Sequence, residues 1–238
     1  MTAVAASSTA MAAIIGNSTA LNAVVSSQTA MTAIAKAPVA MAAIWKNNTA
    51  VQKVQANSTA WATFTGASTS VMGKTVAILA GLNPDDYANM TTIAASSTAM
   101  AAVAASQTAM AAVAASTTAV SAMAASATAK AALLASSLVK VYSWSSSKWT
   151  ANPLTAVSGK GLLLKIQITN NAGSWSLPGT NNHKVLLDGS AFTATNGHST
   201  ANIYQQSTNA VIDESVRRYN SSIQVYLYNA TQITYIPC

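Results

Sequence analysis

The chain has 238 residues, of which 7% are charged, far below the roughly 25% that is usual in globular domains. Its hydrophobic content of 51% consists largely of alanine, and its net charge of +7 is spread along the chain. Because only Arg217 and Arg218 are adjacent basic residues, no basic patch is expected, and nucleic-acid binding is not predicted.

Serine or threonine interrupts every apolar stretch, so no run of 18 apolar residues exists. A membrane-spanning helix needs about 20 such residues, and membrane insertion is therefore not expected. No basic residue precedes the first apolar stretch, so we expect no signal peptide. The one cysteine, Cys238, excludes a disulfide framework.

A ten-residue unit recurs through residues 1–137. It reads Thr-Ala, a large apolar residue, two small residues, a second large apolar residue and a polar end, as in SSTAMAAVAAS at 96–106. The threonine position advances in steps of ten from Thr9 to Thr69 and from Ala88 to Thr128. We therefore divide the shaft into a first block, 1–71, an interruption, 72–87, and a second block, 88–137.

Two positions in each unit carry large apolar residues, two and five residues after the threonine. A spacing of three places both on one face of a helix. Lys130 is the exception at the earlier position. The earlier position holds Met11, Leu21, Met31, Met41, Val51, Trp61, Val71, Met90, Met100, Met110 and Val120, and the later one Ile14, Val24, Ile34, Ile44, Val54, Phe64, Ile93, Val103, Val113, Met123 and Leu133.

A continuous helix cannot keep this apolar face on one side, because ten residues at about 100° each fall about 80° short of three turns. Gly16, Pro38 and Asn57 lie where units end, and these residue types end or break helices. Ser or Asn before the next Thr-Ala is a good N-cap. Each unit is thus predicted to be a helix of about seven residues followed by a three-residue link.

Helices of seven residues are too short to be stable alone, so their apolar residues need close neighbours. We predict a fibrous shaft of parallel identical chains, most simply a homotrimer, in which each chain adds one short helix per layer. A one-chain solenoid, in which successive repeats stack on one another, is the alternative.

The interruption contains two local motifs. Gly73-Lys74-Thr75 has the ending of a phosphate-binding loop, but the glycine required five residues earlier is a serine, and a nucleotide site is not predicted. Asn83 is expected to be an N-cap, with Pro84 in the first helical position and acidic residues in the first turn. This segment is predicted to be a bend, a node or a docking point of the shaft.

From about Leu138 the composition changes to Val, Ile, Tyr, Trp and Thr in short alternating runs separated by Gly, Asn, Pro and Ser. Six to eight short strands in about a hundred residues predict an antiparallel β-sandwich over 138–238. The last two runs, Ile223–Tyr228 and Gln232–Ile236, are expected to form a hairpin.

Catalysis is not predicted in this domain. Its acidic residues are Asp188, Asp213 and Glu214, and both histidines, His183 and His198, lie in polar stretches typical of turns. No nucleophile motif or metal-ligand spacing occurs, so we expect no enzyme activity, no cofactor and no bound metal.

A binding surface is better supported. The stretch 170–183 is polar and contains Trp175, whose ring can stack on a sugar while amides bind the hydroxyls. The alternative is that Trp175 packs beneath its own loop. The candidate ligand-binding residues are Trp175, Asn170, Asn171, Asn181, Asn182 and Tyr204.

The repetitive Ala/Ser/Thr shaft of Thr2–Ser137, followed by a β domain, resembles bacteriophage tail fibres and other virion appendage fibres. The resemblance implies a homotrimer on the virion surface, attached to other virion proteins at one end. It also implies that the C-terminal domain contacts the host, for example a surface glycan, or ends the fibre. A bacterial surface adhesin, or a head fibre or decoration protein without a receptor role, are the alternatives.

Overall fold

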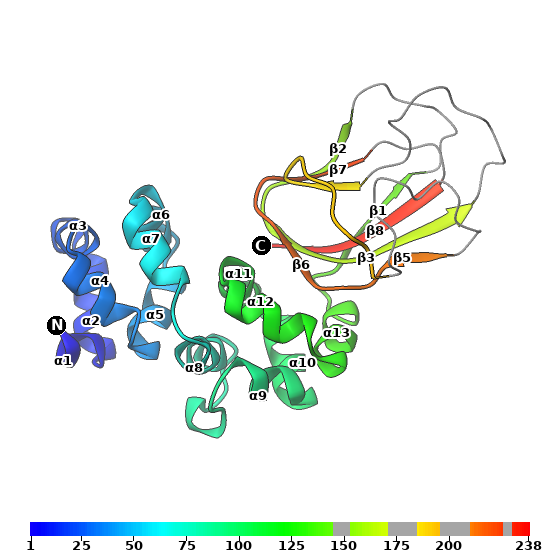
Figure 1. Cartoon of the computed structure of the whole chain (residues 1–238). Helices are drawn as coiled ribbons and strands as arrows, with labels where there is room; N and C mark the ends of the chain where they lie inside the picture. Colours follow the sequence, from blue (N-terminus) through cyan, green and yellow to red (C-terminus); the bar gives the residue numbers. More distant parts are fainter. Residues whose placement is uncertain (145–152, 171–184, 196–209, 226–229) are drawn as a thin grey trace. The chain divides into compact units, whose positions relative to one another are not determined.

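The computed structural model describes residues 1–144, 153–170, 185–195, 210–225 and 230–238. The chain divides into two compact units, Met1–Ala132 and Leu133–Cys238. The first is helical and the second consists mainly of antiparallel sheets, so the chain combines helix and sheet in separate parts (Figure 1).

The helical segment is a series of short helices. Five successive steps of ten residues separate the starts of α2 to α7. The helices are α1 (Thr2–Ala5), α2 (Ser8–Gly16), α3 (Ser18–Ser26), α4 (Gln28–Ile34), α5 (Pro38–Trp45), α6 (Asn48–Ala56), α7 (Ser58–Thr65), α8 (Thr69–Leu79), the 3-10 turn η1 (Pro84–Asp86), α9 (Met90–Ala95), α10 (Ser97–Ala105), α11 (Gln107–Ala115), α12 (Thr117–Ala124) and α13 (Ala127–Leu134).

Outside the interruption, most links between these helices are shorter than the three residues predicted from the sequence, and only the links before α5 and α8 have three. Asn17 alone separates α2 from α3, ending one helix and capping the next. Its extended backbone turns the chain, and its side-chain oxygen accepts the N–H groups of Thr19 and Ala20 at 3.0 Å. Pro38 is the first residue of α5, where its missing N–H costs nothing. The expected break at Pro38 is confirmed.

The helices stack within the one chain. Helix α5 packs on α2, α6 on α3 and α7 on α4, so α5–α7 form a layer on α2–α4 (Figure 1). Further along, α8 packs on α5, α11 on α8 and α12 on α9. Consecutive helices bend sharply, by 106° between α2 and α3 and by 100° between α10 and α11. This is the one-chain stacking left open as the alternative, and it covers most of the apolar residues of the repeat without a second chain.

Burial along the repeat shows which residues face neighbouring layers. The apolar residue two after each threonine is at most 1% exposed in α2 to α5. The residue five after is fully buried in α4 to α7, whereas Ile14 and Val24 in the first layer are partly exposed. The earlier position therefore faces the following layer and the later position the preceding one.

The alanine directly after the threonine is a third buried position, which the sequence did not single out. Ala40, Ala50, Ala99 and Ala109 have no exposed surface. Close packing of helices favours a small side chain here, because each added methylene must be accommodated by its neighbours.

Polar side chains join the layers at their corners. The Asn57 side chain accepts the Ala60 N–H and donates to the carbonyl oxygen of Val25 in the layer below. Gln28 Nε2 also donates to Thr63 Oγ1 at 3.0 Å. Corner residues therefore both begin a helix and hold it to the preceding turn of the stack.

The interruption is a compact junction. Gly73, Lys74 and Thr75 lie inside α8, so their backbone N–H groups belong to a helix and form no phosphate-binding loop. Asn83 caps η1, and Pro84 is its first residue, as predicted. The N-cap of α8 is Ser68, eleven residues after Asn57, the N-cap of α7. Earlier N-caps are ten residues apart, so this repeat is one residue longer.

Substitution of Gly73 is expected to be destabilising. A Cβ atom there would lie 2.3 Å from the carbonyl carbon of Asn89 and 2.7 Å from the nitrogen of Met90, both backbone atoms, so α8 and α9 would have to separate. We expect Gly73→Ala to lower the free energy of unfolding by about 1–3 kcal/mol in denaturant titration.

The matched control for this prediction is Gly16→Ala. Gly16 is also helical, and no atom lies within 4 Å of its Cβ position. Gly16→Ala should therefore raise the free energy of unfolding by about 0.5–1 kcal/mol, because alanine is favoured over glycine within helices. Equal effects of the two substitutions would contradict the close approach of α8 and α9.

The β unit contains two antiparallel sheets. One has the order β1-β8-β3-β5, with β6 also paired to β3, and the other has the order β2-β7-β4. Apolar residues of both sheets, including Leu163, Ile166, Val185 and Ile223, belong to one core. The strands are β1 (Lys140–Trp144), β2 (Leu154–Ser158), β3 (Gly161–Asn170), β4 (Val185–Leu187), β5 (Val211–Asp213), β6 (Arg217–Tyr219), β7 (Ser222–Val225) and β8 (Ala230–Pro237).

The predicted C-terminal hairpin is wrong. Strand β7 pairs with β2 and β4, whereas β8 pairs with β1 and β3 in the other sheet. Apolar and polar residues alternate along both strands, and each strand presents apolar residues, such as Ile223 and Ile233, to the shared core. Alternation shows which face of a strand is buried, but it does not identify the pairing partner.

Candidate binding end of the β unit

Four strand ends lie together at one end of the first sheet. They are the last residues of β1 and β3 and the first residues of β5 and β8. Asn170, the last residue of β3, lies opposite Ala230, the first residue of β8, and β1 also ends opposite the start of β8. The Ile168 N–H donates to the carbonyl oxygen of Ala210, which precedes β5, at 2.9 Å. Trp144, Asn170, Ala210 and Ala230, each of which directly precedes or follows one of the segments 145–152, 171–184, 196–209 and 226–229, therefore lie at this end.

The second sheet supplies the other ends of three of these segments. Val225, the last residue of β7, pairs with Leu154 at the start of β2 and with Val185 at the start of β4. Only residues 226–229 join Val225 to β8 in the first sheet. Because so short a link spans at most about 17 Å, the two sheets present these strand ends at the same end of the unit.

The opposite end of the β unit is closed by short, hydrogen-bonded turns. The Gly159 N–H donates to the Ser221 carbonyl oxygen, and the Cys238 N–H donates to that of Lys160, both at 2.8 Å. Strand β1 starts at this closed end, opposite the last residues of β8. The chain therefore enters the β unit at the closed end, whereas Trp144, Asn170, Ala210 and Ala230 lie at the far end.

One of the sequence-predicted ligand-binding residues belongs to the far end. Asn170 is the last residue of β3. Asn171, Trp175, Asn181 and Asn182 fall in 171–184 and Tyr204 in 196–209, so these five lie outside the described residues. The described strands bring Asn170 and Ala210, one flanking residue of each segment, close together, which the sequence alone could not show.

Asp188 organises the closed end. It is an exposed residue with a positive φ of 52°, in the turn after β4. Its carboxylate accepts the N–H groups of Asn220, Ser221 and Ser222 at 2.7–3.2 Å, and also the Ser221 hydroxyl. Burial raises the pKa of this carboxyl group, but the hydrogen bonds outweigh that effect and hold the pKa below its ordinary value.

This lowered pKa predicts a pH-dependent contribution to stability. A carboxyl group whose pKa is lowered in the folded state stabilises the folded protein when the pH is above its unfolded-state pKa of about 3.9. This contribution is lost as the pH falls through the folded-state pKa. We expect Asp188→Asn, which keeps a residue tolerant of positive φ, to cost about 1 kcal/mol at pH 7, a small value because the group is exposed.

The measurement is the melting temperature of wild type and Asp188→Asn between pH 7 and pH 2. The difference should shrink in the acid range, where the wild-type carboxylate becomes protonated. A difference that stays constant down to pH 2 would show that the charge of Asp188 does not stabilise the turn.

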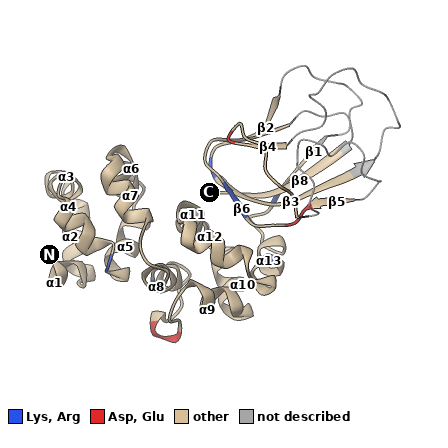
Figure 2. Cartoon of the chain, viewed as in Figure 1, with Lys and Arg blue, Asp and Glu red and all other residues tan. Residues whose placement is uncertain are grey.

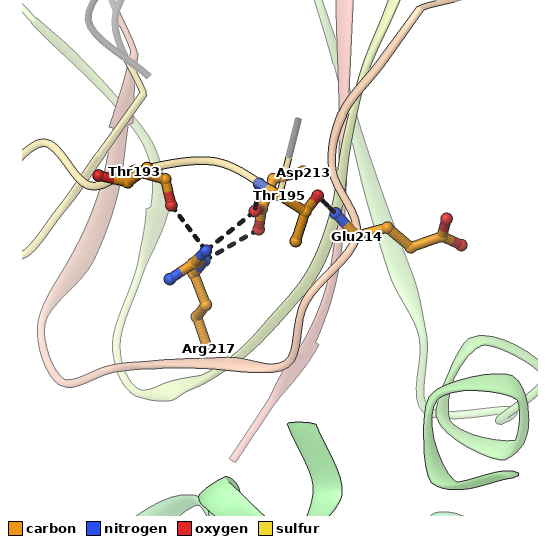
Figure 3. Close-up of polar contacts among 5 residues, drawn as sticks. All are labelled: Thr193, Thr195, Asp213, Glu214 and Arg217. Carbon is orange, nitrogen blue, oxygen red and sulfur yellow. Dashed lines mark hydrogen bonds and ion pairs between the residues drawn. The ribbon is translucent and has the colours of Figure 1, made fainter. Parts of the chain in front are cut away.

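A buried ion pair fastens the segment before 196–209. Asp213 is fully buried, and Arg217 donates to its two oxygens from Nε and Nη2, both at 3.0 Å (Figure 3). Arg217 also donates to the Thr193 carbonyl oxygen at 2.8 Å, and the Thr195 N–H donates to Asp213 at 2.8 Å. The Thr195 hydroxyl in turn accepts the Glu214 N–H. These contacts tie residues 193–195 to β5 and β6.

The described residues offer little reactive chemistry. No three His, Cys, Asp or Glu side chains among them lie close enough to hold a metal ion. Burial raises the pKa of the Cys238 thiol to about 12, so the thiol is protonated at neutral pH and is a poor nucleophile. Acidic residues in the helical segment are confined to the turn between α8 and α9 (Figure 2).

No single helix in the described part of the chain is long and apolar enough to cross a membrane. Two consecutive pairs, α2 with α3 and α10 with α11, meet the length and composition limits only when taken together across their sharp bends.

No known protein family matches the sequence, and a search of curated proteins finds no relative.

Proposed function

We propose that the chain is a structural fibre protein of a bacteriophage virion, a tail fibre or another appendage on the particle surface. In this proposal the helical repeat is a spacer, and the β unit, a two-sheet sandwich, binds a partner without converting it. The partner is a host-surface glycan or another virion protein.

The observation that carries the proposal is the arrangement of strand ends in the β unit. Asn170 and Ala210, which flank the segments that contain Trp175 and Tyr204, lie at one end, and the chain enters at the other end. Clustered loops at one end of a two-sheet domain form binding surfaces in many β-sandwiches. A loop end far from the chain's entry suits the free tip of a fibre.

The helical repeat suits a spacer for a physical reason. A stack in which each layer contacts its neighbours can be lengthened by whole repeats without a change in the rest of the fold. The described helices also carry few charged groups that could perform chemistry.

Assembly into a parallel homotrimer remains part of this proposal, but for a different physical reason from the one that the sequence suggested. Most apolar residues of the repeat are already covered inside one chain, so a trimer is not needed to stabilise the short helices. Its role would be to combine three copies of a weak binding end, which raises the overall avidity.

The test replaces Gly173–Asn181 by a short Gly-Ser turn and, separately, makes Trp175→Ala. The readouts are binding of the full chain to immobilised surface glycans of candidate hosts and to purified particles. We expect both variants to fold and to bind at least tenfold more weakly. Ser190→Ala, at the closed end, is the matched control and should bind as wild type does. Unchanged binding of both loop variants would refute the binding role.

A bacterial surface adhesin is the second candidate function, because the same binding end would serve it. The two are separated by location: antibodies against the chain should label phage particles if the proposal is right, and uninfected bacterial cells if the chain is an adhesin.

A further inference from the structure

Every corner between the helices α1 to α7 turns the chain in the same way. The N-cap residue at each corner has an extended backbone, with φ between −98° and −124° and ψ between 104° and 115°. Because α2 and α3 meet at a bend of 106°, three such bends nearly complete a full turn. Each repeat therefore turns the chain by about a third of a turn. The corner residues, which recur every ten positions, are Ser7, Asn17, Ser27, Ala37, Asn47 and Asn57.

The packing of these helices follows from that turn. Each helix from α4 to α8 packs on the helix three places before it, beginning with α4 on α1 and ending with α8 on α5. Three repeats, or thirty residues, thus make one layer, although the sequence repeats every ten. The rule stops at the interruption, since α9 and α10 pack on α8 rather than on α6 and α7.

The same hydrogen bond between layers occurs in both blocks of the repeat. Asn57 Nδ2 donates to the carbonyl oxygen of Val25, and Ser126 Oγ donates to that of Ala94, with 32 residues between donor and acceptor in each case. Both donors also accept an N–H group of the helix that follows them. Asparagine in one block and serine in the other make the same contact, so the contact depends on the position within the repeat and tolerates a change of residue.

The apolar contacts between layers are equally unspecific. The earlier apolar position, which faces the following layer, is methionine in three of the helices α2 to α5 and leucine in the fourth. Methionine is flexible and adapts to neighbours of different shape. Residues 1–71 contain no aspartate or glutamate, so no ion pair between side chains can select one helix as the partner of another.

We infer that the helices of the first block pair by count, so that each helix stacks on whichever helix stands three places before it and each ten-residue repeat is one step of a screw. Packed helices lie about 8–10 Å apart, so one added repeat would lengthen the stack by about 3 Å and turn the following helices by a third of a turn. The inference rests on the proposed spacer role only for its purpose: the number of repeats sets how far, and in which direction, the chain extends.

The experiment inserts a second copy of residues 48–57 directly after Asn57, so that the added helix follows an asparagine cap as α6 does. The copy then stands three helices after α4, the place that α7 holds in wild type. In a Cys238→Ser background, Gln28→Cys in α4 is combined either with Thr63→Cys or with Lys53→Cys in the copy. Lys53 and Thr63 occupy the same position in their repeats, and Thr63 contacts Gln28 in wild type. A short bis-maleimide joins cysteines that lie close together, and mass spectrometry identifies the linked single chains.

We expect the link to move from position 63 to position 53 of the copy, with at least a tenfold loss of the link at 63. The matched control inserts ten Gly-Ser residues at the same place. Because this segment forms no helix, α7 should stay on α4 and the link at 63 should remain.

Two results would overturn the inference. In the variant with the added repeat, a link at 63 that is stronger than the link at position 53 of the copy would show that helices recognise particular partners. A loss of helicity by circular dichroism relative to the Gly-Ser control would show that the stack does not accept another step. Neither result bears on the binding role of the β unit, which the loop variants test through glycan or particle binding.

Discussion

Replacing Arg217 by alanine is expected to lower the free energy of unfolding of the β unit by about 3–5 kcal/mol. The substitution leaves the carboxylate of Asp213, which has no exposed surface, without its ionic partner. It also removes the bond to the Thr193 carbonyl oxygen and the cation–π contact with Phe192, whose ring centroid lies 4.5 Å from the guanidinium carbon. Hydrogen exchange of β3 and β5 amides, followed by mass spectrometry, measures the loss within this unit.

The control for this prediction removes the buried charge together with its partner. In the double variant Asp213→Asn with Arg217→Ala no unpaired carboxylate remains, so part of the lost stability should return. Exchange rates in Arg217→Ala that match wild type to within the equivalent of about 0.5 kcal/mol, the usual effect of a surface substitution, would show that the pair is dispensable.

Replacing Phe64 by alanine is expected to cost about 3–5 kcal/mol in the helical unit, because it opens a cavity in the layer contact. Phe64 has no exposed surface, and its ring lies 5.5 Å from that of Trp45. Chemical denaturation followed at 222 nm reports on the helices and gives the change in free energy of unfolding.

Trp61→Ala is the comparison for Phe64→Ala. Although tryptophan is larger, part of the Trp61 side chain is already exposed, so less buried surface is lost. Measured at low protein concentration, where copies are separate, Trp61→Ala should cost less than Phe64→Ala. The reverse order would mean that α7 presents a different face to its neighbours.

Much of the helical segment could be predicted from the sequence, because its signals are local. The ten-residue period cannot follow a continuous helix, and Pro38 marks a helix start. The length of the links could not be predicted, since a single Asn17 both ends one helix and caps the next. An apolar stripe on a helix also does not indicate whether another repeat of the same chain or a different chain packs against it.

The β unit was harder to predict, because strand pairing is set by contacts between distant residues. Long alternating runs identified β3 and β8, but Val211–Asp213 and Arg217–Tyr219 are three residues each and contain charged residues, so they carried no strand signal. The candidate ligand residues were chosen by composition alone. The position of Asn170 at one end of the sheet, with Ala210 beside it, follows only from the register of β3, β5 and β8.

The central claim is that the repeats stack within one chain, and a cross-link between α4 and α7 tests it most directly. Gln28 and Thr63, whose side chains are 3.0 Å apart, are replaced by cysteine in a Cys238→Ser background and joined by a short bis-maleimide. Our account predicts a cross-linked product with the mass of one chain. In a shaft where short helices are covered only by other chains, residues 28 and 63 lie several layers apart, and products of two or three linked chains without the single-chain product would contradict the account.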